Sequence, residues 1–555
     1  MFNEEVLAEI EQARAEYEKR IKSILGKYGE KELEETTVSG IPLKMVYTPL
    51  DITKVDYLKD IGFPGVYPFT QGVTPTGYQT KEWTIRQVVG IGTAEETNER
   101  LKHLFEQGQT GFSVCGMGYD PYESSDERSL GMLGRGGVWI DSLADIETLF
   151  AGIDMEKISI NQIGCSIPVF AMILAEAQRR KIELAKLRGT IQNCVIPGGE
   201  GPRFEGNGTI DIIEYCSKNL PLWNHTSISV RNIRDQGVSA LQEIAFGLYL
   251  GLYTIKSAMA RGLGVDEVAP RVSFFLSAEN EFLEEVAKYR AMRRVWARLM
   301  REDMGAKDPR SWLMRFHVQT TALNLTAQQP YNNLIRSTIH ALAAILGGAQ
   351  SLSVNSFDEA LAIPTEASAT LSIRTQQIIF YETGIANVLD PLGGSYCVET
   401  LTNQLEEQAR EILDYLNRLS PERAFRYMEE EADEAGYQRQ RAIDNGERVL
   451  VGVNRFVMEE EESVPAHSVK LQEYDPGWRD RQIARLEKVK RERDPKKVEA
   501  AKKMLAQAYR SRVNIIEPMI EAVKAYLSIG EIVQIRKEVF GDMNLSRFGG
   551  KFFGM

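Results

Sequence analysis

Hydrophobic and polar positions follow two different periods along most of the chain. Between about residues 60 and 400, short strand-like runs are separated by longer stretches with helical spacing. The strand-like runs include 157–163, 188–193, 226–230, 271–277, 313–320 and 350–356, and the helical stretches include 237–261, 278–304, 328–347 and 358–383. Strands that alternate with helices indicate a parallel α/β fold, and this length suits a (β/α)8 TIM barrel with insertions.

Both ends of the chain have a purely helical pattern. Near the amino end, Val6, Ile10, Tyr17, Ile21 and Ile24 form an apolar stripe at helical spacing. Such a helix either packs on a partner or lies on its own domain, and the pattern leaves both open. Beyond about residue 400 the chain is helical and heavily charged. The pattern predicts an N-terminal helical arm at 1–50 with a possible subunit contact, a barrel at 51–400, and a C-terminal helical extension at 401–555.

Several predicted strands carry one polar face, whereas Val, Ile and Leu normally fill the interior of a parallel barrel. Side chains alternate between the two faces of a strand. The polar sets are Arg315, His317 and Gln319; Ser351, Ser353 and Asn355; Ser227, Ser229 and Arg231; and Thr190 and Gln192. A single such face can be open to water, but four together favour a ligand-lined barrel axis. A buried Arg or Gln without a partner costs several kcal/mol, so a ligand is expected to supply one.

Charge and cysteine usage exclude some classes of protein. The net charge of −12 argues against nucleic-acid binding, since a phosphate backbone requires a basic surface. Five cysteines without metal-ligand spacing indicate reduced thiols, which predicts a cytoplasmic protein. The charged, helix-periodic start is no signal peptide, and no apolar run approaches the length of a membrane span.

A series of long motifs connects these strands to a known family. They are YPFT (67–70), WTIRQ (83–87), GTAEETNE (92–99), GTIQN (189–193), APRVSFF (269–275), RFHVQT (315–320), TAQQPYNNLIR (326–336), GGAQSLSVNSFDEALAIPT (347–365), DPLGGSYCVE (390–399) and GVNRF (452–456). In this order they resemble the adenosylcobalamin-dependent acyl-CoA mutases typified by methylmalonyl-CoA mutase, over most of residues 1–545. The resemblance implies a (β/α)8 barrel that threads the pantetheine arm of CoA along its axis, which agrees with the polar strand faces.

The resemblance also implies roles for individual residues. Contacts to the acyl-CoA thioester or its phosphates would come from Thr76, Lys81, Thr84, Arg86, Ser113, Asn224, Arg271, Ser273, Arg315, His317, Gln319 and Gln350. Gln192, Arg231, Asn232 and His317 would act beside the reacting carbons. Asn355 and Glu359 match positions that hold the adenosyl ribose, and a helix cap in the NSFDEA segment is the alternative. Lys81 stands where the family usually has Arg.

The cofactor implied by the resemblance is adenosylcobalamin. The family binds it through a flavodoxin-like domain with a DxHxxG motif, whose histidine coordinates cobalt. None of His103, His225, His317, His340 and His467 lies in such a motif. We therefore expect a cobalamin-binding small subunit to hold most of the cofactor, in a hetero-oligomer that is a dimer or a tetramer.

Positions near the reacting carbons depart from the methylmalonyl enzymes. Val88 and Leu323 stand where those enzymes have Tyr and Trp, and both changes open apolar volume. Asn232 replaces a carbonyl-binding histidine, and its amide N–H could serve instead. Cys115 stands where 2-hydroxyisobutyryl-type enzymes have an aspartate, and a thiol cannot anchor a substrate hydroxyl as a carboxylate would.

The usual carboxylate-binding arginine is also replaced, here by Pro202, which leaves Arg203 or Arg231 to hold a free carboxylate. The resemblance implies a radical 1,2-rearrangement, and these departures favour a bulkier acyl-CoA as its substrate, such as an alkyl- or aryl-substituted one. One alternative is a methylmalonyl-CoA or 2-hydroxyisobutyryl-CoA mutase, and another is a non-catalytic CoA-thioester-binding subunit. A barrel enzyme that uses a metal or a Schiff-base lysine is disfavoured, because no carboxylate and histidine ligand set lies at the strand ends.

Overall fold

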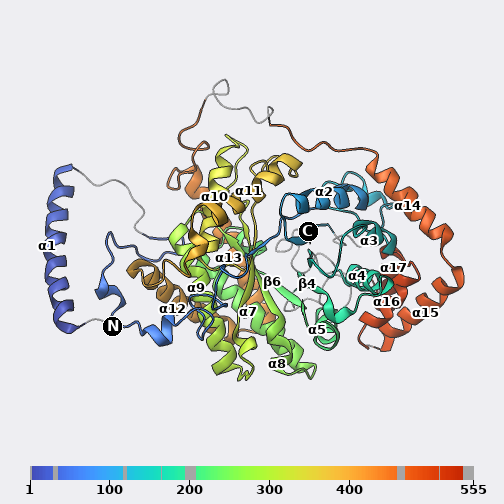
Figure 1. Ribbon diagram of the computed structural model, residues 1–555, viewed down its shortest axis with the longest axis horizontal. Coiled ribbons are helices and arrows are strands. Elements are labelled where there is room, and N and C mark those ends of the chain that lie inside the picture. The colour runs from blue at the N-terminus through green and yellow to red at the C-terminus, as the bar shows by residue number, and fades with distance from the viewer. Residues whose placement is uncertain are drawn as a thin grey trace.

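The computed structural model describes residues 3–28, 36–116, 122–163, 166–193, 208–458, 469–511 and 513–541 (Figure 1). Its strands form two parallel runs, in the order β1-β9-β8-β7-β6 and β2-β3-β4-β5. They are β1 (Thr84–Ile85), β2 (Gly111–Val114), β3 (Ser159–Gln162), β4 (Arg188–Ile191), β5 (Trp223–Asn224), β6 (Thr226–Ser229), β7 (Val272–Ala278), β8 (Arg315–Thr320) and β9 (Ser351–Ser353).

The two runs join into a closed barrel at two seams. At one seam β5 and β6 are a single interrupted strand, because only His225 separates them; β5 pairs with β4 and β6 pairs with β7. At the other, Val89 just beyond β1 forms a parallel bridge with Val114 of β2. The nine strands therefore occupy eight positions in the described part of the chain, and the predicted (β/α)8 fold is confirmed.

A helix follows each strand position and packs outside it, which is the parallel crossover arrangement that the alternating pattern predicts. These helices are α2 (Ala94–Glu106), α3 (Leu143–Leu149), α4 (Ile167–Arg179), α5 (Gly208–Asn219), α7 (Ala240–Ala260), α9 (Phe282–Arg298), α10 (Asn332–Leu346) and α11 (Glu366–Glu382). Two short helices, α6 (Arg231–Arg234) and α8 (Val265–Val268), lie within the connection between β6 and β7. In Figure 1, α2–α5 lie on one side of the strands and α9–α11 on the other.

The two faces of the strands divide apolar from polar residues. Phe274 of β7 packs edge-on against Trp296 of α9, with ring centroids 5.0 Å apart. Phe316 of β8 stacks on Tyr289 of the same helix at 5.4 Å. These aromatic residues point outward to the helices, so the residues between them, such as His317, point to the barrel axis. The hydrophobic core thus lies between the strands and the helices that surround them.

At the amino end, α1 (Glu4–Tyr28) stands apart from the barrel at the left of Figure 1. This agrees with the predicted amphipathic helix, and parts of its apolar stripe are exposed: Val6 at 44%, Tyr17 at 43% and Ile24 at 42%. A contact between this helix and another subunit stays a prediction.

The carboxyl-terminal helices lie against two sides of the barrel. They are α12 (Tyr396–Arg418), α13 (Pro421–Asp444), α14 (Trp478–Glu492), α15 (Pro495–Ser511), α16 (Ile516–Lys524) and α17 (Ile529–Phe540). The first, α12, packs on α7 and α9, whereas α16 packs on α4. In Figure 1, α14–α17 form a layer outside α3 and α4. Among all the helices described, none is both long and apolar enough to cross a membrane.

Candidate active site

Polar side chains from most of the strands line a cavity of about 300 Å³ along the barrel, which we call the axial cavity. It brings together nine of the residues predicted from the sequence: Lys81, Thr84, Arg86, Gln192, Asn224, Ser273, Arg315, His317 and Gln350. Some of them lie in the strands, whereas Lys81 and Gln350 precede a strand and Gln192 follows one. The axial cavity is therefore inside the barrel, where the alternate polar positions of the strands point.

Hydrogen bonds between neighbouring strands fix several of these polar groups. Asn161 donates from Nδ2 to the Ser113 hydroxyl at 2.9 Å, and Asn224 donates from Nδ2 to Thr190 Oγ1 at 3.1 Å. The Arg86 guanidinium donates to the Ser159 hydroxyl at 2.6 Å. Because each group is held by the next strand, the wall of the axial cavity is rigid before any ligand binds.

Three polar atoms of residues that line the axial cavity have no partner among the described residues. These buried atoms are Nε2 of His317, Nε of Arg86 and Oδ1 of Asn224. An unpaired buried polar group costs about 1–3 kcal/mol, so three in one cavity point to a polar ligand. Burial and the nearby Arg86 guanidinium hold the pKa of His317 well below its usual range. The imidazole is therefore neutral at pH 7.

Cationic side chains gather where β7 and β8 begin. Burial together with the neighbouring Arg271 and Arg310 lowers the pKa of Arg315 to about 10, and burial also lowers the pKa of Arg271. Within the described part of the chain no ion pair neutralises either Arg271 or Arg315, whereas Arg310 is paired with Asp308 at 2.6 Å. Arg315 lines the axial cavity, whereas Arg271 lies near Arg315 without lining it. Two uncompensated arginines at this end suit an anionic group such as a phosphate.

Lys81 and Gln350 line both the axial cavity and an adjoining one of about 180 Å³. Thr76 lies outside the axial cavity, with its hydroxyl 2.6 Å from that of Thr80. Ser113 is buried behind the axial cavity wall, bonded to Asn161. The structure thus places Lys81 at a junction between two hollows, and Thr76 and Ser113 near the axial cavity without lining it.

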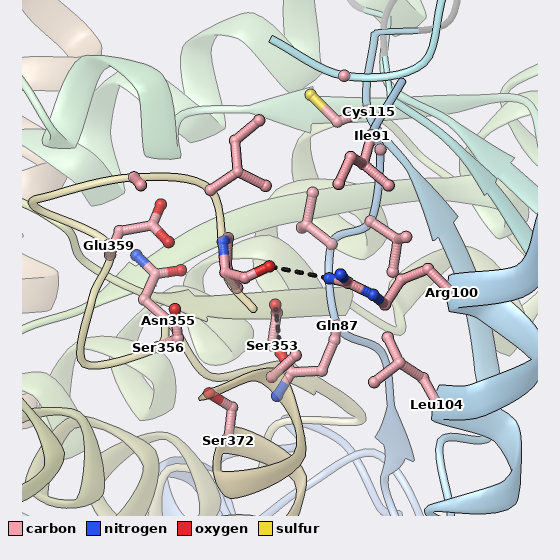
Figure 2. Close-up of a pocket in the computed structure, with 18 of the residues that line it drawn as sticks. Gln87, Ile91, Arg100, Leu104, Cys115, Ser353, Asn355, Ser356, Glu359 and Ser372 are labelled. Atoms are coloured by element: carbon pink, nitrogen blue, oxygen red, sulfur yellow. Dashed lines mark hydrogen bonds between the residues drawn. The ribbon is translucent and has the colours of Figure 1, made fainter. Parts of the chain in front are cut away.

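A second cavity of about 310 Å³, which we call the upper cavity, lies at the carboxyl ends of β1, β2, β8 and β9. Of the predicted residues it is lined by Val88, Cys115, Gln319, Asn355 and Glu359. Figure 2 shows Cys115 on one side of it and Asn355 and Glu359 on another. In a (β/α)8 barrel the carboxyl ends of the strands are where active sites are built.

Two groups of the upper cavity fit a ligand with hydroxyl groups. Gln319 donates to Asn355 Oδ1 at 2.6 Å, whereas Nδ2 of Asn355 is buried without a partner among the described residues. Burial raises the pKa of Glu359 to about 7. No helix begins at Asn355, since α11 starts at Glu366 with Thr365 as its cap. The alternative of a helix cap for Asn355 is therefore wrong.

Arg231, Phe275 and His317 form a stack. The Arg231 guanidinium lies 5.6 Å from the Phe275 ring centroid, and that ring lies 5.1 Å from the His317 ring. Arg231 also pairs with Asp235 at 2.9 Å. Asn232 and Leu323 follow β6 and β8, and neither of them is among the residues that line the two cavities. Pro202 and Arg203 are outside the described residues, so the predicted carboxylate contact of Arg203 stays a prediction.

Sequence reasoning missed two arginines that line the upper cavity, Arg100 and Arg135. Arg100 donates to the Pro364 carbonyl at 2.8 Å and to Gln472 at 2.9 Å, so backbone and amide groups already engage it. Arg135 lies in the glycine-rich segment 134–137, and a lone charge among glycines was the available signal.

Comparisons with known proteins show which family the chain is similar to. The family model for methylmalonyl-CoA mutase matches residues 36–542. The 2-hydroxyisobutanoyl-CoA mutase large subunit of Aquincola tertiaricarbonis is 40% identical over 560 residues, which cover 97% of this chain and 98% of that one. The methylmalonyl-CoA mutase of Cereibacter sphaeroides is 38% identical over 91% of this chain and 72% of its own length. The human mitochondrial enzyme is 37% identical over 91% of this chain and 68% of its own.

Proposed function

The chain belongs to the methylmalonyl-CoA mutase family, and we propose that it is the large, substrate-binding subunit of a heteromeric acyl-CoA mutase. Mutases of this family are cobalamin-dependent isomerases. The reaction proposed is a radical rearrangement in which a group moves between adjacent carbons of an acyl-CoA. The observation that carries the proposal is the axial cavity, whose unpaired His317, Arg86 and Asn224 atoms call for a polar ligand.

The pantetheine arm of CoA is assigned to the axial cavity. Its amides and thioester carbonyl can bond the unpaired Arg86, Asn224 and His317 atoms. The phosphates are assigned to the cationic end, near Arg271 and Arg315, because neither arginine is neutralised by a carboxylate in the described structure. A charge-assisted contact of this kind contributes about 1.5–3 kcal/mol. This orientation sends the acyl group toward the carboxyl ends of the strands.

The reacting end of the substrate and the adenosyl group are assigned to the upper cavity. Asn355 with its free Nδ2 and Glu359 with its pKa near 7 suit the hydroxyl groups of a ribose. Adenosylcobalamin supplies the radical chemistry when bound. The residues of this chain orient the thioester, fix the ribose and keep water from the reacting carbons.

A second polypeptide, a cobalamin-binding small subunit, is proposed to hold most of the cofactor, in a dimeric or tetrameric assembly. The support is the extent of the alignment, which covers 98% of a relative that is named as a large subunit. Cys216 and Cys397 form no disulfide among the described residues, which suits a reducing compartment, so we assign the complex to the cytoplasm.

The substrate proposed is a bulkier acyl-CoA than methylmalonyl-CoA. Val88 and Cys115 are small residues that line the upper cavity. Arg231 lies within 2.9 Å of Asp235, so it must leave that partner, or share it, to bind a free carboxylate. A 2-hydroxyisobutyryl group is the second candidate, because the relative with that activity is 40% identical.

Reconstitution tests the subunit assignment. The purified chain, alone and mixed with a cobalamin-binding small subunit, is incubated with adenosylcobalamin and gel-filtered. We expect the chain alone to bind acyl-CoA and to retain no stoichiometric cobalamin, and the mixture to retain cobalamin and isomerise an acyl-CoA. Stoichiometric cobalamin on the chain alone contradicts the proposed division. A mixture that binds acyl-CoA and cobalamin without turnover supports the non-catalytic alternative instead.

A further inference from the structure

A tryptophan from the carboxyl-terminal helices lies directly behind one wall of the upper cavity. Trp478 is the first residue of α14 and is only 5% exposed. It forms a small hydrophobic cluster with Ile91, Leu133 and Trp139, separate from the main core. Those three residues lie on or beside the loops after β1 and before α3. A residue from late in the chain is therefore part of the support of the barrel loops.

Two glycines lie in close contact with the indole ring of Trp478. A Cβ atom added at Gly92 would lie 2.7 Å from Cε2 of Trp478, and one added at Gly134 would lie 2.5 Å from its Cε3. Both glycines have positive φ, at 59° and 81°, which other residues rarely adopt. The Gly92 amide lies 3.4 Å from the Gly134 carbonyl, so the two loops meet at the indole.

The same loops pack backbone to backbone where they form the wall. A Cβ atom at Gly90 or at Gly137 would lie 2.5 Å from the Cys115 carbonyl oxygen. That carbonyl accepts a hydrogen bond from Val138 at 3.0 Å, and the Cys115 amide donates to Val89 at 2.7 Å. With no room between them, a shift of one loop must move the others.

An aromatic chain links Trp478 to a charge in the upper cavity. Tyr474 packs edge-on against Trp478, with ring centroids 5.4 Å apart. The guanidinium of Arg135, which lines the upper cavity, lies 4.4 Å from the Tyr474 ring centroid. Such a cation–π contact restrains the direction of the arginine.

Helix α14 is firmly anchored beneath these contacts. Gln482, which is fully buried, donates to Asp141 at 2.9 Å and to Asp145 at 3.0 Å. Arg481 pairs with Glu96 of α2 at 2.8 Å. The helix is thus tied to α2 and to the start of α3 within about one turn after Trp478, and the indole has a fixed position from which to support the loops.

We propose that Trp478 is a positioning residue that sets the shape of the acyl-binding wall formed by Val88, Cys115 and Arg135, and so helps to determine which acyl group is accepted. This inference rests on the proposed function, which assigns the acyl group to the upper cavity. Trp478 itself does not line that cavity. It acts through Gly92, Gly134 and Tyr474, and α14 is accordingly part of the specificity apparatus.

The test is a calorimetric comparison of free CoA, acetyl-CoA and isovaleryl-CoA as ligands of the full chain. In Trp478→Leu we expect the preference for isovaleryl-CoA over CoA to change by about tenfold, as for a misfit of one or two methyl groups. Affinity for free CoA should stay within about twofold, because the axial cavity is unaltered. Trp478→Phe, which keeps an aromatic ring between the glycines, should restore most of the wild-type preference.

Two further variants keep the outcome interpretable. Tyr474→Ala changes a side chain that is 36% exposed, so it tests the same wall without emptying a core site. It should shift the preference in the same direction even if Trp478→Leu does not fold. Leu486→Ala, in the same helix and equally buried, should lower the melting temperature and leave the preference unchanged. The inference is overturned if the preference is unaltered in Tyr474→Ala and in every Trp478 variant that folds. A wild-type chain that binds none of the three ligands overturns the proposed function as well.

Discussion

The Nδ1 atom of His317 lies 2.8 Å from the Ser351 hydroxyl of the neighbouring strand, while its Nε2 is buried without a partner among the described residues. One ring nitrogen is thus fixed by the barrel and the other faces the axial cavity. Because burial keeps the imidazole neutral, only one of its nitrogens carries a proton. If the Ser351 hydroxyl donates to Nδ1, that proton is on Nε2 and can bond the thioester carbonyl or a pantetheine amide.

Replacing His317 by Ala should therefore weaken acyl-CoA binding by about tenfold, the value of one buried hydrogen bond and its packing. The loss of affinity caused by His317→Ala should also be the same from pH 6 to pH 8, because the pKa of His317 lies well below that window. Calorimetry across this pH range measures both the loss of affinity and its dependence on pH. His103→Ala, on α2 and bonded to Thr370, is the control with unchanged affinity. A binding curve that titrates near pH 6.5 and loses this feature in His317→Ala contradicts a neutral imidazole.

Truncation of Arg271 or Arg315 to Ala should weaken every CoA ligand by roughly tenfold or more, free CoA included, since the phosphates are common to all. The wild-type affinity should fall with rising salt, and each variant should show a smaller salt dependence. Arg310→Ala removes an exposed arginine already paired with Asp308 and serves as the matched control. If both variants bind CoA as the wild type does, the phosphates lie elsewhere.

Glu359→Gln should change the pH dependence of stability near neutrality. Burial raises the pKa of Glu359 to about 7, above its unfolded value, so the folded chain loses stability as the pH rises from that unfolded value to about 7, and the loss is constant above it. The loss shrinks as the pH falls below 7 and disappears only near the unfolded pKa, where the carboxyl is protonated in both states. The variant should therefore gain melting temperature relative to wild type as the pH rises from 5 to 7, and the difference should then stay level up to pH 8. A difference that is constant across this range shows that Glu359 does not titrate there.

Much of the barrel could be predicted from periodicity alone. The strand-like runs at 271–277 and 313–320 lie within a residue or two of β7 and β8, because both strands are long and alternate apolar with polar residues. The strands β1 and β2 were not predicted as strands. The first has two residues, and the second, GFSV, begins with a glycine, so neither gives a periodic signal.

The candidate site was predictable only where strands carry it. Alternation predicted that Arg315 and His317 would face the axis, and the structure places both in the axial cavity wall. It could not predict Arg135, because this residue reaches the upper cavity from a loop without periodicity. The support of that loop by Trp478 depends on contacts across more than 340 positions of sequence, which no local pattern encodes.

Enlarging Val88 to Tyr should block bulky acyl groups selectively. Val88 lines the upper cavity, and overpacking a well-filled site commonly costs about 1–3 kcal/mol. We expect isovaleryl-CoA binding to weaken by roughly tenfold or more while free CoA is unaffected. Val449→Tyr, at a position 43% exposed, is the size-matched control. Equal losses for both ligands would show that Val88 lies on the path of the CoA arm instead.

The most direct test of the central claim is the turnover of an acyl-CoA panel by the chain reconstituted with a cobalamin-binding small subunit and adenosylcobalamin. The panel contains methylmalonyl-CoA, 2-hydroxyisobutyryl-CoA, and alkyl- and aryl-substituted succinyl-CoA thioesters, with kcat/KM obtained from product mass spectrometry. We predict cofactor-dependent isomerisation, with a substituted thioester turned over more efficiently than methylmalonyl-CoA. Efficient turnover of methylmalonyl-CoA with every bulkier thioester inert contradicts this account of the upper cavity.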